Sequence, residues 1–171
     1  MEQNAGAHIL EQRGIVASLD REFARLHLRL TAIIESTPAS LLYEDSVPSA
    51  IRGLRSIAEN VLRSAAVIEQ TFGGLTANLW DDPFEWTLPE QLSSPATVLA
   101  HLREVEQTRT HAFLSFTDDS CLLKSIATPG DGLVSLVELL LQTLLHATHY
   151  QTRAVVALQA LSGISPSGLI I

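Results

Sequence analysis

Apolar residues recur along this chain at steps of three and four, the spacing that places side chains on one face of an α-helix. This pattern predicts four helices, over residues 15–33, 51–75, 95–117 and 133–161. Pro38 stops the first helix, and Gly163 ends the fourth. Four long amphipathic helices without a strand pattern predict an all-α fold, a four-helix bundle.

The connections between these helices differ in length. The longest, residues 76–94, links the second helix to the third and can cross the whole bundle, so simple up-down-up-down order is not assured. Within it, Trp80, Phe84 and Trp86 are expected to pin the crossover onto the bundle, and Asp81-Asp82 to cap or solvate it. Two-residue hairpin signals are absent, and residues 118–120 and 129–132 are interpreted as helix breakers around a short helical turn at 121–126.

Composition limits the class of protein. With 171 residues, 46% of them apolar and 18% charged, the chain predicts one globular domain over 1–171 with its core at about 10–163. A net charge of −8 argues against a nucleic-acid surface, and no apolar run approaches the roughly 20 residues that span a bilayer. The single cysteine, Cys121, is expected to be a buried structural thiol. It excludes an internal disulfide and fits a cytoplasmic protein, as does the absence of a signal-peptide pattern at the N-terminus.

The fourth helix carries the most informative pattern. Its expected apolar face is broad: Leu133, Val137, Leu140, Leu144, Val155 and Leu158 form its middle, and residues such as Leu141, Leu145 and Ala147 widen it. The remaining polar stripe is narrow and consists of Gln142, His146, His149, Tyr150 and Arg153. An ordinary solvent side would carry several Lys and Glu instead. The stripe therefore faces either a functional pocket, or solvent or a partner chain.

The chemistry of this stripe is varied. Two imidazoles three or four residues apart can bind one divalent metal, and histidine also moves protons near neutral pH. The Tyr150 hydroxyl can donate a hydrogen bond to a developing oxyanion, and Arg153 can hold a carboxylate by two contacts. These two residues are the candidate catalytic groups.

Several segments resemble the DinB-like superfamily of bacterial four-helix bundles, which includes YfiT-type metal-dependent hydrolases. The resemblance rests on Leu41-Leu42-Tyr43, the stretch Ile57 to Arg63, Pro129-Gly130, and the stretch His146 to Arg153. It implies a metal-dependent transferase or hydrolase, in some members acting with a low-molecular-weight thiol, and the expected metal is zinc or nickel. It also implies a homodimer, which the abundance of apolar helix faces favours as well.

The family places one metal-binding histidine on its second helix and two on its fourth, four residues apart. His146 matches the first of that pair, Tyr150 stands where the second would be, and His149 lies one place earlier. Arg63 stands at or near the expected histidine of helix two, with Asn60 one turn before it. The helical period places Arg63 toward solvent, so either the alignment slips here or the second helix has two buried faces.

His101, at the margin of the third helix's apolar face, is a candidate third ligand beside His146 and His149. The alternative is a histidine at the edge of the core. Four further residues are expected at the surface: His8, His27, Arg109 and His111.

Two functions compete. In the first, the chain has lost its metal and binds a small organic molecule or a partner, and the pocket is lined by Asn60, Arg63, His146, Tyr150 and Arg153. In the second, it is a divalent-metal-dependent hydrolase or thiol transferase with His146 and His149 as ligands, and the metal makes a nucleophile at neutral pH. The altered ligands favour the first.

Overall fold

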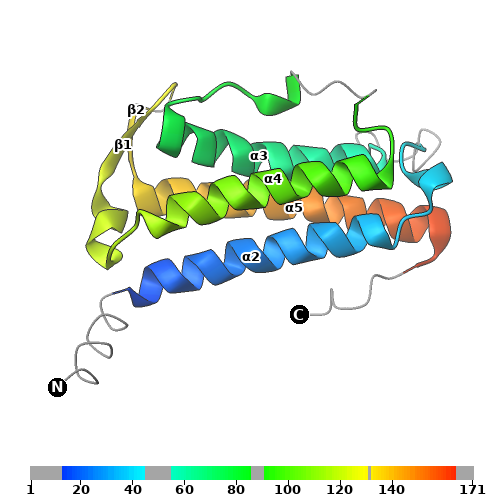
Figure 1. Ribbon diagram of the computed structural model, residues 1–171, viewed down its shortest axis with the longest axis horizontal. Coiled ribbons are helices and arrows are strands. Elements are labelled where there is room, and N and C mark those ends of the chain that lie inside the picture. Colours follow the sequence, from blue (N-terminus) through cyan, green and yellow to red (C-terminus); the bar gives the residue numbers. More distant parts are fainter. Residues whose placement is uncertain (1–12, 45–54, 86–90, 131, 165–171) are drawn as a thin grey trace.

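The structure is a computed structural model that describes residues 13–44, 55–85, 91–130 and 132–164. Within these residues, four long helices lie lengthwise beside one another (Figure 1), namely α2 (Gly14–Glu35), α3 (Ile57–Ala77), α4 (Pro95–Leu114) and α5 (Leu136–Ser162). Three short 3-10 helices lie in the connections, η1 (Ala39–Leu41), η2 (Pro83–Glu85) and η3 (Asp119–Leu123). The expectation of a mainly helical chain with four long helices is confirmed.

The packing of the helices defines two opposite sides. Helix α3 packs against α5 and α4, and α2 packs against the same two helices. The α2–α5 side therefore lies opposite the α3–α4 side. In Figure 1, α2 and α5 run in one direction and α3 and α4 in the other, because the connection after α3 returns along that helix before α4 begins.

Aromatic side chains from three helices meet in the core. The ring centroids of Phe23 and Phe72 are 5.2 Å apart, and Phe113 lies 5.7 Å and 5.6 Å from them. All three side chains are fully buried. These distances suit edge-to-face and tilted contacts, so the cluster joins α2 to the C-terminal parts of α3 and α4.

Serine caps fix where three of the helices begin. Ser56, Ser94 and Ser135 each accept a hydrogen bond from the backbone N–H three residues later. Helix α3 therefore begins at Ile57 and not near residue 51 as expected; residues 51–54 lie outside the described residues. Helix α5 begins at Leu136, later than the expected residue 133.

The expectation of no strands is wrong. Strand β1 (Ser125–Thr128) pairs antiparallel with β2 (Gly132–Ser135), in a register that joins Ile126 to Val134. Gly130 has φ 97°, a left-handed conformation that glycine adopts without strain. The strands have only four residues each, too few for an alternating pattern to stand out. The expected helical turn at 121–126 is present in part, as η3.

A distant carboxylate caps α2. Arg13 supplies no side-chain cap there, but Asp119 of η3 accepts hydrogen bonds from the backbone N–H groups of Ile15 and Val16 at 2.9–3.1 Å. An acceptor with negative charge at a helix N-terminus satisfies free donors and complements the helix dipole. None of the helices in the described part of the chain combines the length and the apolarity needed to cross a membrane.

Candidate functional site

Helix α5 does not bury the face that the sequence predicts. Leu140 and Leu158 are buried as expected, but the middle of the buried face is formed by Thr143, Ala147 and Gln151. Small and polar residues fit there because α3 and α5 pack closely. Leucines are displaced to the outside: Leu145 is 70% exposed and Leu141 48%.

Hydrogen bonds explain the buried polar groups on α5. The Thr143 hydroxyl lies 2.7 Å from that of Thr71, and Ser64 donates to the Ala147 carbonyl at 2.8 Å. On the other side, the Gln151 amide donates to the Leu26 carbonyl of α2 at 3.0 Å. Buried polar groups with partners are not penalised, so these contacts fix α5 between α3 and α2.

The structure divides the predicted polar stripe. His146 and His149 are exposed, whereas Tyr150 and Arg153 are half-buried. Tyr150 lies toward α3 and η2, and His149 and Arg153 lie toward α2. The rings of His149 and Tyr150 touch edge to face, with centroids 5.6 Å apart. The predicted stripe is therefore divided between two surfaces, with Tyr150 on one and His149 and Arg153 on the other.

Helix α3 has more than one buried face, as one of the two alternatives for Arg63 requires. The crossover covers this side of the helix, and the Arg63 guanidinium lies over the Phe84 ring, 4.0 Å from its centroid. Its Nη2 is also 3.7 Å from a carboxylate oxygen of Glu59. Asn60 is fully buried; its amide donates to two backbone carbonyls, but its Oδ1 has no partner.

The candidate metal set of His101, His146 and His149 is not assembled. His101 lies on α4, diagonally across from α5, so it does not join His146 and His149. Among the described residues, no group of three His, Cys, Asp or Glu side chains is placed to hold a metal ion. The guanidinium of Arg63 is also cationic and would repel one. The residues present do not fit zinc or nickel.

Arg63 and Tyr150 do meet, but in a small space. They line a cavity of about 60 Å³ together with Gln70, Asp82 and Phe84. Pockets for organic ligands usually measure about 300–1,000 Å³. This cavity has room for water but not for an organic substrate.

A larger groove lies between α2 and α5. It measures about 620 Å³; its apolar lining comes from Leu26, Leu141, Leu144 and Leu145, its charged lining from Glu22, Arg29 and Arg153, and His149 also lines it. Glu22 already pairs with Arg25 at 2.5 Å. Neither Arg29 nor Arg153 forms an ion pair with another described residue. The groove therefore joins an apolar wall to free positive charge, in a chain of net charge −8.

A second groove, of about 580 Å³, lies on the opposite side between α3, α4 and the crossover. His101 and Glu69 face each other across it, with 3.7 Å between Nε2 and Oε2. Burial raises the pKa of Glu69, an effect that His101 partly offsets and Glu104 reinforces. The sequence shows no pattern linking Glu69 to His101, because the two residues lie on different helices.

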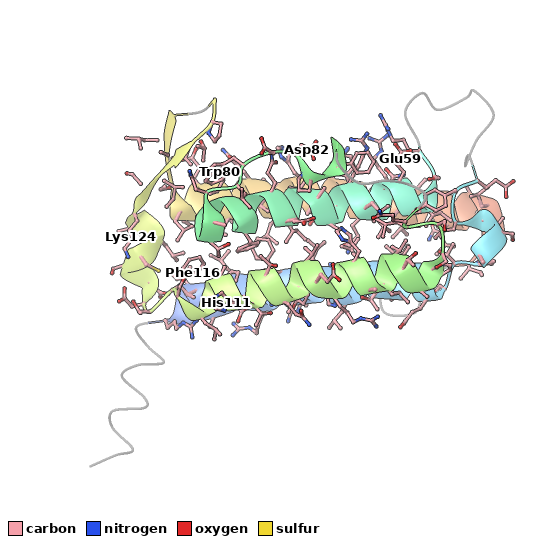
Figure 2. The ribbon with its side chains drawn as sticks, turned by 45° about the horizontal axis from the view of Figure 1, so that its top comes forward. Glu59, Trp80, Asp82, His111, Phe116 and Lys124 are labelled. Atoms are coloured by element: carbon pink, nitrogen blue, oxygen red, sulfur yellow. The ribbon has the colours of Figure 1, made fainter. Side chains whose placement is uncertain are left out.

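The expectation that Arg109 lies at the surface is wrong, because its guanidinium is buried between α4 and α2. The guanidinium pairs with Glu106 at 2.7 Å and with Asp20 of α2, and Arg109 as a whole is only 3% exposed. His27, also expected at the surface, is half-buried beside it. Burial lowers the pKa of His27, while Glu106 raises it and Arg109 lowers it further. His111 is exposed as expected (Figure 2), and His8 lies outside the described residues.

The crossover is held as the sequence predicts. Trp80 and Asp82 lie over α3 in Figure 2, and Phe84 packs against the core. Asp82 accepts a hydrogen bond from the Phe84 N–H at 2.9 Å, a local turn contact. Cys121 is buried. Trp86 lies outside the described residues.

In comparisons with protein-family models, curated proteins and solved structures, no match to this chain was found.

Proposed function

We propose that this chain is a DinB-like helical bundle that binds a small amphipathic carboxylate in the groove between α2 and α5. One observation carries the proposal: an apolar wall of leucines stands beside two guanidinium groups, of Arg29 and Arg153, that have no ion-pair partner among the described residues. Guanidinium binds carboxylate through paired hydrogen bonds, and the leucines suit an alkyl chain.

The arrangement along the groove supports this ligand class. Leu141 and Leu145 line one end, and His149, Arg153 and Arg29 follow toward the other. An aliphatic carboxylate laid along the helices would place its chain on the leucines and its head group between the two arginines. The volume of about 620 Å³ lies within the range for organic ligands.

The described residues give no support to a metal-dependent hydrolase or thiol transferase. His146 and His149 are exposed on α5 without a third ligand among the described residues. Arg63, at the position of the expected histidine, is engaged with Phe84 and Glu59.

The test is a calorimetric titration with octanoate, using 1-octanol as the uncharged control. We expect octanoate to bind more tightly than 1-octanol. R153Q and R29Q should each weaken octanoate binding about tenfold, since a hydrogen bond to a charged group contributes about 1.5–3 kcal/mol. R103Q, on the exposed side of α4, is the matched control and should bind as the wild type does.

Two results would contradict the proposal. Equal affinity for octanoate and octanol would remove the role of the arginines. The second contradicting result would come from sedimentation equilibrium. A tight dimer that L145E converts to monomer would show that a second copy of the chain occupies the groove. The homodimer that the resemblance implies stays a prediction.

A further inference from the structure

The groove on the α3–α4 side has the opposite electrostatic character. Its carboxylates are Glu69 of α3 and Asp81 of the crossover, and no Lys or Arg is among the described residues that line it. The last residues of α3, Thr76 and Ala77, also line it, so the negative end of the helix dipole lies at the groove. The site therefore favours a cation.

One oxygen of the Glu69 carboxylate, at this groove, has no hydrogen-bond partner. Oε2 of Glu69 is shielded from solvent and accepts no hydrogen bond, and the nearest imidazole nitrogen, Nε2 of His101, is 3.7 Å away. That distance is too long for a hydrogen bond. A carboxylate with a buried oxygen and no donor is costly. The Glu69 side chain is still 38% exposed, so a ligand cation beside its exposed part would offset some of that cost.

The walls of the groove are firmly held. The Trp80 ring packs directly on α3, where a Cβ at Gly74 would lie 2.4 Å from it. Gln70 donates to the Trp80 carbonyl at 2.7 Å, and the Leu79 N–H donates to the Gly73 carbonyl at 3.2 Å. Leu79 and Asp81 are thus held at the edge of the groove, which limits the ordering cost of binding.

We propose that this groove binds a small organic ammonium ion, with the Glu69 carboxylate as its counter-ion and His101 as a second hydrogen-bond partner. The ammonium carries several N–H donors, enough to serve the exposed part of the Glu69 carboxylate and the acceptor nitrogen of the His101 ring together. Leu79, Ala77 and Pro83 supply apolar surface for the organic part. The raised pKa of Glu69 agrees with a carboxylate that lacks a cation beside it.

The probe is phenethylammonium, titrated into isotopically labelled protein and followed by NMR; 3-phenylpropionate, of similar shape and opposite charge, is the control. We expect saturable shifts of the Gly73 amide and the His101 ring with the ammonium and none with the carboxylate. E69Q should weaken binding about tenfold, the loss expected for a charged hydrogen bond. E35Q removes the same charge from an exposed residue at the end of α2 that lines neither groove, and it should bind as the wild type does.

The proposal fails if phenethylammonium gives no saturable shift at these two residues. It also fails if 3-phenylpropionate shifts the same two residues equally well, because the groove would then select shape alone. Wild-type affinity in a folded E69Q variant, shown by its amide spectrum, would remove Glu69 from the site.

Discussion

At the scale of single residues, the polar side chains that the sequence misplaced are those whose partners come from another helix. Arg109 is an example, since its place on α4 alone suggests the surface. Its burial depends on Asp20 of α2 and on Glu106 one turn before it, which together neutralise the guanidinium. The one sequence signal was the i, i+3 pairing of Glu106 with Arg109, a pattern that is equally common on exposed helix faces.

Glu69 gives a prediction for the pH dependence of stability. Its pKa in the folded protein is raised by burial, which Glu104 reinforces and His101 opposes. The folded state therefore holds more protons than the unfolded chain between the ordinary carboxyl pKa and the raised value. The free energy of unfolding should fall as the pH rises through this window, and the penalty should persist above it.

The measurement is urea unfolding of wild type and E69Q from pH 4 to pH 8. We expect E69Q to gain stability relative to wild type as the pH rises, since glutamine has no charge to bury. The other titrating groups largely cancel in this difference. If the wild type instead became more stable relative to E69Q with rising pH, the difference in free energy of unfolding would have the opposite sign. Glu69 would then be stabilised as a carboxylate.

At the scale of elements, the crossover depends on one close contact. An ideal Cβ at Gly74 would lie 2.4 Å from the Trp80 ring, far inside van der Waals distance. G74A should therefore destabilise the protein by about 1–3 kcal/mol, the usual cost of overpacking. In a W80A background the same change should instead stabilise by about 0.5 kcal/mol, because alanine favours the helix over glycine.

This reversal of sign is measured by a double-mutant cycle in urea. A G74A cost that remains unchanged without Trp80 would show that another neighbour sets it, and the account of the crossover would then be wrong.

The elements also show how far the sequence pattern reaches. Periodicity located the four helices, because each has a stripe that faces the core. It misplaced the buried face of α5, because close packing with α3 and α2 selects Thr143, Ala147 and Gln151 over nearby leucines. The helical spacing reflects only which residues are apolar. Burial on α5 depends instead on the size of each side chain and on its hydrogen-bond partners from other helices. Both grooves depend on such pairings between helices.

At the scale of the whole molecule, two grooves lined by described residues lie on opposite sides and carry opposite charge. The α2–α5 groove has Arg29 and Arg153, and the α3–α4 groove has Glu69 and Asp81. Helices α2 and α3 make few direct contacts with each other. Ligands of opposite charge should therefore bind the two sides independently, since sites without shared partners usually add.

Octanoate and phenethylammonium together test this independence. Each ligand at ten times its dissociation constant should raise the free energy of unfolding by about 1.4 kcal/mol, and both together by about 2.8 kcal/mol. The measurement is urea unfolding with neither, either and both ligands. If the second ligand added nothing to the first, the two would share one site, and the assignment of opposite charges to two grooves would be wrong. A sum well above the expected value would mean that the helices transmit binding from one groove to the other.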